Sequence, residues 1–277
     1  MADSGRLVKS RNDSFPSVMG ILNVTPDSFF EDSRVNSVED ALIRSDQMIK
    51  DGAEWLDIGG ESTRPGAKPV DPEEELKRVV PVVRAIRERF PKIGLSIDTR
   101  RANVAKEAIK AGVSMINDVS GLSDPEMRDV AIKYDLPICV MHMKGLPENM
   151  QKNTNYDDVV TEVKKFLKDT TSTLLNEGFS ANKIIVDPGI GFGKQLHHNT
   201  ALLSAGREIV PNQDMHLMWG VSRKRMFEDL LSRKRTIDRL AGTLGIAAMA
   251  RDKGVDIIRV HDVREHVDLY TAMSVVE

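Results

Sequence analysis

The chain has 277 residues, 40% of which are hydrophobic, so it can bury a sizeable core in one large domain or in two domains of about 100–200 residues each. Its formal net charge is only −3, with 39 basic and 42 acidic residues. This near balance gives no electrostatic basis for binding nucleic acid or a membrane, and we expect neither as a partner.

The start of the chain is polar and charged, and it lacks the apolar segment of a signal peptide. No apolar run approaches the roughly 20 residues that span a bilayer. We therefore expect a cytoplasmic protein in which residues 1–14 form a flexible tail and residues 15–277 form one folded domain.

Short runs rich in apolar and β-branched residues alternate along the chain with longer amphipathic segments. The short runs predict strands at residues 18–24, 54–58, 94–97, 115–117, 137–141, 183–186, 216–220 and 256–260. The amphipathic segments predict helices at residues 38–50, 72–90, 101–111, 157–176, 236–253 and 263–276. Asp71 provides an N-cap for the second of these helices, and Gly112, Gly178 and Gly254 follow helix ends as C-cap signals.

Eight strands that alternate with helices predict an α/β protein with an all-parallel sheet. A closed barrel and an open, doubly wound sheet both fit this count. The glycine-rich fingerprint of dinucleotide-binding folds is absent after the first strand, and no linker or repeat divides the chain. The sequence therefore predicts a single α/β domain.

Polar or ionisable residues follow every predicted strand. In a closed barrel of parallel strands these ends converge on one pocket. Asp118, Asp124 and Asp262 have a simpler explanation, because an acidic residue after a strand is often the N-cap of the next helix. Capping does not explain all eight strand ends together, whose residues include Asn23, Arg64, Asp98, Asn117, His142, Asp187, Lys224 and His261.

Three of these residues can recognise a polar ring. The side-chain oxygens of Asp98, Asn117 and Asp187 can accept hydrogen bonds from a ring edge rich in N–H donors. Buried carboxylates need a partner, because burying one unpaired costs several kcal/mol. The alternative is that these acids pair with Arg or Lys inside the barrel.

Lys224, Arg259 and His261 form a cationic side that suits a phosphate or diphosphate group. For His261 alone a buried core histidine would be the better explanation, but Arg259 two residues earlier favours ligand contact. The chain contains no cysteine–histidine metal pattern. Mg²⁺ is compatible with a diphosphate ligand, because it needs only one or two protein oxygens.

Two further features favour a structural explanation. Cys139, the only cysteine, lies in an apolar run and is expected to be a small buried side chain rather than a reactive thiol. The adjacent His197 and His198 are expected on a solvated loop or helix start.

The loops after the strands closely resemble those of the dihydropteroate synthases. The matching stretches are residues 19–29, 57–66, 96–99, 116–122, 141–143, 187–194, 220–224 and 259–263, in the order of that family. The longest of them read MGILNVTPDSF, DIGGESTRPG and DPGIGFGK. Stretches of this length, spread over nearly the whole chain, are not explained by chance.

The resemblance implies an α/β fold with a single (β/α)8 TIM barrel, usually a homodimer. It implies a transferase of folate biosynthesis that uses Mg²⁺ and belongs to a family targeted by sulfonamides, which mimic p-aminobenzoate. The reaction of the family condenses 6-hydroxymethyl-7,8-dihydropterin diphosphate with p-aminobenzoate to give 7,8-dihydropteroate and pyrophosphate. We expect a dissociative substitution at the pterin methylene, without a covalent enzyme intermediate.

Carried over to matching positions, the resemblance assigns four groups of site residues. The expected pterin contacts are Asp98, Asn117, Val119, Met141, Asp187 and Lys224. The expected p-aminobenzoate contacts are Thr63, Arg64, Pro65, Phe192 and Ser222, with Lys224 beside them. The expected diphosphate contacts are Asn23, Arg64, Arg259 and His261, and Asn23 is also the expected Mg²⁺ ligand. The residues expected to act in catalysis are Arg64, Lys224, Arg259 and His261.

Two stretches, residues 30–33 and residues 144–154, depart from the family pattern without removing an assigned residue. Two alternatives share the expected pterin contacts: a pterin-dependent methyltransferase and a non-catalytic pterin-binding relative. A methyltransferase would not need residues 63–65, nor the anion site at Arg259 and His261. The full set of loop residues favours the synthase.

Overall fold

The computed structural model describes residues 15–24, 37–64, 66–145, 147–152 and 154–276. The flexible tail expected at residues 1–14 lies outside these residues, and so does most of the loop after the first strand.

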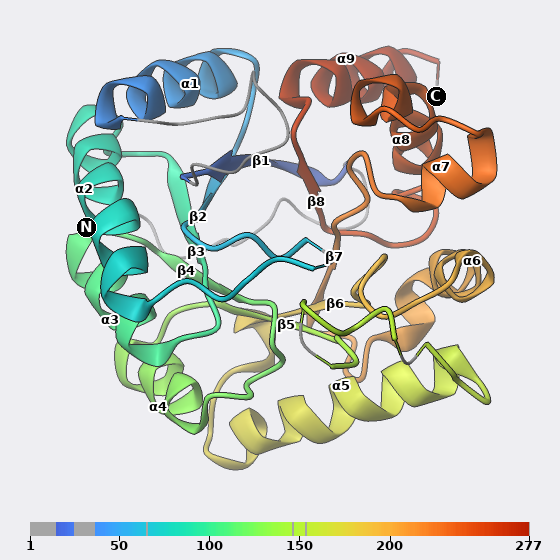
Figure 1. Cartoon of the computed structure of the whole chain (residues 1–277), viewed down its shortest axis with the longest axis horizontal. Helices are drawn as coiled ribbons and strands as arrows, with labels where there is room; N and C mark the ends of the chain where they lie inside the picture. The colour runs from blue at the N-terminus through green and yellow to red at the C-terminus, as the bar shows by residue number, and fades with distance from the viewer. Residues whose placement is uncertain (1–14, 25–36, 65, 146, 153, 277) are drawn as a thin grey trace.

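Eight parallel strands close into a barrel with helices around it (Figure 1). The strands are β1 (Ser17–Asn23), β2 (Trp55–Gly59), β3 (Gly94–Asp98), β4 (Met115–Asp118), β5 (Ile138–Met141), β6 (Ile184–Asp187), β7 (His216–Trp219) and β8 (Ile257–Val260). Each strand pairs with the next in sequence, and β8 pairs with β1. The expected (β/α)8 barrel is therefore confirmed, and the open sheet is excluded.

The helices that cover the barrel come from the segments between the strands. They are α1 (Val38–Lys50), α2 (Pro72–Arg89), α3 (Ala102–Ala111), α4 (Pro125–Tyr134), α5 (Val159–Asn176), α6 (Leu196–Ala205), α7 (Met226–Leu231), α8 (Leu240–Ala248) and α9 (Val263–Ser274). The main core lies between these helices and the outer face of the strands. Asp71 caps α2 as predicted, because its side chain accepts a hydrogen bond from the backbone N–H of Glu73 at 2.9 Å.

The prediction of one helix over residues 236–253 was wrong in part. A short 3-10 helix, η4 (Thr236–Arg239), leads into α8, which ends at Ala248, and Gly254 belongs to a turn beyond the helix. The helices α4, α6 and α7 were not predicted. His197 and His198 lie at the start of α6, as expected, but His198 is buried rather than solvated.

The side chains inside the barrel form layers, and the position of each layer determines which strand residues point toward the site. Its apolar layer consists of Met19, Met115, Cys139, Ile185, Met218 and Ile257. Side chains two residues apart on a strand share a face, so Asn117, Asp187 and Arg259 point into the barrel one step nearer its C-terminal mouth. Cys139 is fully buried, which confirms its prediction as a core side chain.

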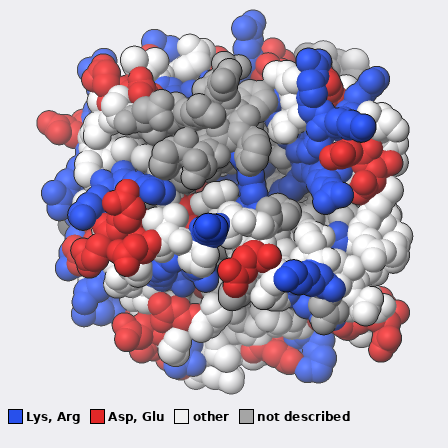
Figure 2. Space-filling model, in the orientation of Figure 1, with Lys and Arg blue, Asp and Glu red and all other residues white. Residues whose placement is uncertain are grey.

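On the face of the molecule that Figure 2 shows, basic and acidic side chains are interspersed. Within the described residues, no helix combines the length and the apolar character needed to cross a membrane.

Candidate active site

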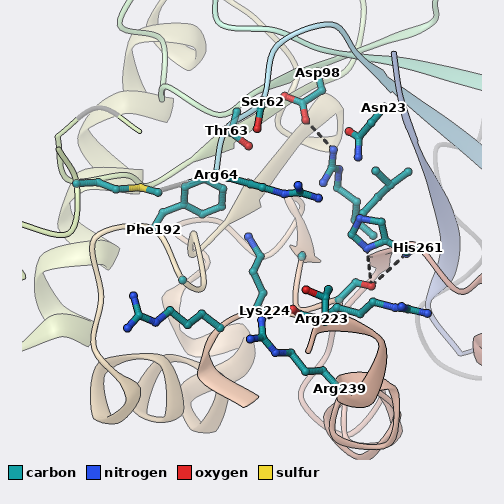
Figure 3. Close-up of a pocket in the computed structure, with 18 of the residues that line it drawn as sticks. Asn23, Ser62, Thr63, Arg64, Asp98, Phe192, Arg223, Lys224, Arg239 and His261 are labelled. Carbon is teal, nitrogen blue, oxygen red and sulfur yellow. Dashed lines mark hydrogen bonds and ion pairs between the residues drawn. The ribbon is translucent and has the colours of Figure 1, made fainter. Parts of the chain in front are cut away.

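A cavity of about 380 Å³ lies at the C-terminal ends of the strands (Figure 3). Its wall includes nine of the predicted site residues: Asn23, Thr63, Arg64, Asp98, Phe192, Ser222, Lys224, Arg259 and His261. These come from β1, β3 and β8, from the loops after β2, β6 and β7, and from the residue that follows β8. The barrel therefore brings most of the predicted site together in one place.

Arg259 forms the centre of a buried ion-pair network. Its Nε lies 2.5 Å from Oδ2 of Asp57, and its Nη2 lies 2.6 Å from Oδ2 of Asp98. The amide of Asn117 donates to the same Asp57 oxygen at 2.9 Å. The alternative considered for the acids is thus realised for Asp98, which pairs with an arginine inside the barrel.

Burial changes the protonation of the groups around this network. It raises the pKa of Asp98 to about 7, against the opposing effect of Arg259. It lowers the pKa of Lys224 to about 8, against the attraction of Asp187, and it raises the pKa of Asp187 itself. Near neutral pH the site therefore holds groups that can change charge when a ligand enters.

His261 differs from its predicted cationic role. Burial, helped by the charge of Arg259, lowers its pKa to about 3, so the imidazole is neutral at physiological pH. Its Nδ1 lies 2.9 Å from Oγ of Ser222, and its backbone N–H donates to the same oxygen at 3.1 Å. Since Ser222 already accepts from this N–H, its hydroxyl proton can go to Nδ1, which leaves Nε2 as a hydrogen-bond donor.

Four predicted pterin contacts lie behind the cavity wall rather than on it: Asn117, Val119, Met141 and Asp187. Val119 and Met141 pack with Phe192 and with Met150, which is 1% exposed. Oδ1 of Asp187 accepts from the backbone N–H of Gly189 at 2.7 Å.

The loop after β6 places an aromatic ring beside a cation. The Nζ of Lys224 lies 4.0 Å from the centroid of the Phe192 ring. Gly189, Gly191 and Gly193 all have positive φ, between 63° and 83°, which glycine adopts without strain. Figure 3 shows Arg64 and Lys224 directed toward the same space beside this ring.

The loop after β2 carries Thr63 and Arg64 to the cavity, while Pro65 lies outside the described residues. Glu61 anchors the start of this loop through Arg100, at 2.8 Å, and Arg101, at 3.0 Å. Farther along, the backbone N–H of Gly66 donates to the carbonyl of Pro147 at 3.0 Å. The loops after β2 and β5 therefore support each other.

Asn23 lines the cavity and could contact a hard cation. Its side-chain oxygen lies on the same side as Asp98, since Oδ1 of Asn23 and Oδ2 of Asp98 would each be 3.7 Å from a Cβ on Gly59. Among the described residues, no group of three or more His, Cys, Asp and Glu side chains could hold a metal by themselves. A single amide oxygen completed by phosphate and water oxygens is nevertheless a usual Mg²⁺ environment.

Sequence reasoning missed several residues of the cavity wall, among them Glu61, Met150, Gln151, Arg223 and Arg239. Nε of Arg223 pairs with Oδ2 of Asp262 at 2.7 Å, and no capping hydrogen bond from Asp262 to α9 is present. Capping is confirmed for Asp124, which caps α4.

Asp118 instead accepts backbone N–H groups in the loop that follows it, those of Ser120 and Leu122. The N-cap explanation is therefore wrong for Asp118, although its role remains a local structural one.

Residues 19–261 match the family model of the pterin binding enzymes. The barrel and its polar pocket fit this class. The pocket combines acidic side chains, which suit the N–H groups of a ring edge, with cationic side chains, which suit an anion.

Individual relatives narrow the class further. Dihydropteroate synthase of Escherichia coli strain K12 is 46% identical over 264 residues, which cover 95% of this chain and 92% of that protein. The Yersinia pestis dihydropteroate synthase, solved in a sulfonamide complex, superposes with a TM-score of 0.89 at 43% identity over 95% of this chain and 94% of that one. The Burkholderia cenocepacia dihydropteroate synthase, solved with 7,8-dihydropteroate, gives 0.85 at 41% identity over 94% and 91%. The chain belongs to the dihydropteroate synthases, a family of transferases in folate biosynthesis.

Proposed function

We propose that this chain condenses 6-hydroxymethyl-7,8-dihydropterin diphosphate with p-aminobenzoate to form 7,8-dihydropteroate and pyrophosphate. The observation that carries the proposal is that one cavity contains both an acid suited to a pterin ring and cations suited to a diphosphate. Asp98, the acid proposed to bind the ring, is ion-paired there to Arg259, the cation proposed to bind the diphosphate. Arg64 and Lys224 line the same space.

The pterin is proposed to enter against the strand ends of β3, β4 and β6. Asp98, Asn117 and Asp187 would accept from the ring edge, and Lys224 would donate to it. Asn117 and Asp187 lie just behind the cavity wall. Met150 packs with Val119 and Met141, so it would have to move for the ring to reach their apolar surface. The amide of Asn117 donates to Asp57, and the carboxylate of Asp187 accepts from the backbone N–H of Gly189.

The arylamine is proposed to bind between the loops after β2, β6 and β7. Phe192 offers a ring face, Thr63 and Arg64 close the other side, and Pro65 is assigned there by the family pattern alone. Ser222 would bind the carboxylate through its backbone N–H, because its hydroxyl proton is used at Nδ1 of His261. Holding the arylamine nitrogen beside the pterin methylene makes the reaction effectively unimolecular.

The substitution is proposed to be dissociative. The methylene carbon–oxygen bond breaks with its electron pair leaving on the diphosphate, and the arylamine nitrogen then donates its lone pair to the carbon and loses a proton. Arg64, Arg259 and the Nε2–H of His261 would stabilise the leaving group electrostatically. Mg²⁺ bound at Asn23 would add positive charge beside the diphosphate oxygens.

The direct test mixes the protein with both substrates and Mg²⁺ and follows dihydropteroate and pyrophosphate together. Equal amounts of both products, abolished by EDTA, are expected. Arg64→Ala should lower kcat/KM about 100-fold or more, because it removes a cation from the developing charge. The exposed Lys68 of the same loop is the control, since Lys68→Ala should leave kcat/KM within about 2-fold.

Other outcomes would redirect the assignment. Methyl transfer from a methylated folate without pyrophosphate release would indicate the methyltransferase alternative, and tight pterin binding without turnover would indicate a binding relative. A covalent pterin adduct on a side chain would contradict the dissociative mechanism. A loss of stability in Arg64→Ala as large as its loss of activity would remove Arg64 from the ligand contacts.

A further inference from the structure

Lys194, the last residue of the DPGIGFGK stretch, is buried without an ion-pair partner among the described residues. It is 4% exposed, and its Nζ contacts four acceptors. Nδ1 of His142 lies at 2.9 Å, and the carbonyl oxygens of Gly189, Phe192 and His142 lie at 3.0, 3.1 and 3.3 Å. An ammonium has three protons to give, so this cage uses all of them.

The groups around Lys194 are in a state that lets them accept hydrogen bonds from its Nζ. Burial, helped by the charge of Lys194, lowers the pKa of His142 to about 3, so its ring is neutral and Nδ1 can accept. Burial also lowers the pKa of Lys194 to about 7, while the nearby Asp187 opposes that effect. Burying a charge in this way is costly, and simple packing does not require it.

The cage holds one particular piece of the active site. Both Gly189 and Phe192, whose carbonyls it binds, belong to the turn that carries the Phe192 ring to the cavity. The turn passes so close to β5 that a Cβ on Gly189 would lie 1.9 Å from the His142 carbonyl oxygen. Beyond it, the hydroxyl of Tyr156 donates to the carbonyl of Gly193 at 3.1 Å.

The backbone of Asp187, in contrast, is held by the sheet rather than by Lys194. Asp187 is the last residue of β6, it is paired in register with Met141, and its carbonyl accepts from the backbone N–H of His142 at 3.0 Å. Removal of the Lys194 side-chain nitrogen should therefore disturb the turn after β6 more than the backbone of Asp187, which precedes it.

We propose that Lys194 is a positioning residue for the arylamine: its buried ammonium holds the turn from Gly189 to Phe192 in the shape that presents the Phe192 ring to p-aminobenzoate. The proposal rests on the proposed function, since it concerns the second substrate of that reaction. Lys194 does not line the cavity and acts through Phe192.

The test is steady-state kinetics on Lys194→Met, which keeps the chain length and removes the donors. The KM for p-aminobenzoate should rise about 10-fold or more, as expected for the loss of charged hydrogen bonds. The affinity of the variant for the pterin diphosphate with Mg²⁺, measured by calorimetry, should stay within about 3-fold of the wild-type affinity. Lys164→Met, at an exposed position of α5, is the matched control and should change neither value.

A double-mutant cycle separates positioning from a general structural role. If Lys194 acts through the ring, Lys194→Met should add little to the KM of a Phe192→Ala protein. An unchanged KM in the single variant, additive effects in the cycle, or equal losses for both substrates with a lower melting temperature would each overturn the proposal. If Lys194→Met does not fold, Tyr156→Phe tests the same turn: a KM for p-aminobenzoate about 3-fold higher supports the proposal, and no change overturns it.

Measurements on the wild-type protein distinguish failure of this proposal from failure of the proposed function. Product formation by the wild type decides the reaction, whereas the ratio of variant to wild-type KM decides the role of Lys194.

Discussion

Arg259 joins two parts of the site that the sequence assigned to different ligands. It was expected to bind the diphosphate, whereas Asp98 was expected to bind the pterin, yet their side chains form an ion pair. Nη2 of Arg259 carries two N–H groups, so one could donate to a phosphate while the other stays on Asp98. One arginine would in this way contact both ends of the proposed substrate.

Asp98 makes a testable contribution to pterin affinity. Asp98→Asn should weaken binding of the pterin diphosphate about 10- to 100-fold, the range for losing a charged hydrogen bond. Calorimetry at pH 8 measures this directly. An unchanged affinity would exclude Asp98 from the pterin contacts.

The pH dependence of binding follows from the same residue. Its pKa of about 7 in the free protein means that the acceptor is increasingly protonated as the pH falls below 7. A ligand that needs the carboxylate therefore binds best above this pKa, and its affinity should decline from pH 7 to pH 5. In Asp98→Asn this decline should disappear, while any loss above pH 8 from deprotonation of Lys224 should remain.

For single residues, the sequence predicted which side chains line the site better than it predicted which side chains contact each other. The polar strand ends and the family pattern identified nine residues of the cavity wall. Asp57 was inside a quoted stretch but received no role, because its partner Arg259 is about 200 residues away and only the barrel joins them. The neutral state of His261 could not be predicted either, since it depends on burial beside Arg259.

The secondary-structure elements followed sequence patterns where periodicity and caps were both strong. The helix α1 begins and ends at the predicted residues, and each strand boundary lies within one residue of its prediction. The helix α8 contains no charged residue and has glycines at positions 242 and 245, so periodicity did not locate its end. The helix α7 has only six residues, too few to show a repeating pattern.

Asp124 is a cap whose role can be tested apart from catalysis. Its Oδ1 accepts from the backbone N–H of Glu126 at 3.0 Å, and its Oδ2 accepts from that of Ala102 at 2.8 Å. It therefore secures the first turns of both α3 and α4. Asp124→Ala should lower the free energy of unfolding by about 1–2 kcal/mol, measured by urea denaturation.

The same variant should retain its KM for both substrates, because Asp124 does not line the cavity. The exposed Asp129 of α4, changed to Ala, is the control and should alter stability by less than about 0.5 kcal/mol. A large change in either KM would show that the cap also shapes the site.

Along the barrel axis, the apolar side chains that stabilise the fold and the polar side chains of the candidate site occupy different levels. The apolar layer inside the barrel lies below the polar strand ends, and β1 and β8 each contribute a side chain to both. This arrangement explains why a sequence with eight alternating units predicted the location of the site before any single contact was known. It does not by itself predict how one chain meets another.

The oligomeric state is the remaining expectation at this scale. Among the described residues, six of the eight exposed large apolar side chains lie from Leu230 onward, in α7, η4 and the C-terminal segments of the chain. Because exposed apolar side chains of this kind often mark protein interfaces, we expect a homodimer that uses this region. Light scattering after size exclusion should give the mass of two chains, and Leu230→Asp with Met249→Asp should shift it toward one.

The control for this experiment is Ile43→Asp on α1, where a side chain that is 62% exposed lies outside the C-terminal region. That variant should remain dimeric. Each aspartate in the proposed interface removes an apolar burial of about 1.5–3 kcal/mol, so the double variant should dissociate at least about 100-fold more readily. A wild type of single-chain mass would refute the dimer, and a dimer undisturbed by both aspartates would move its interface elsewhere on the barrel.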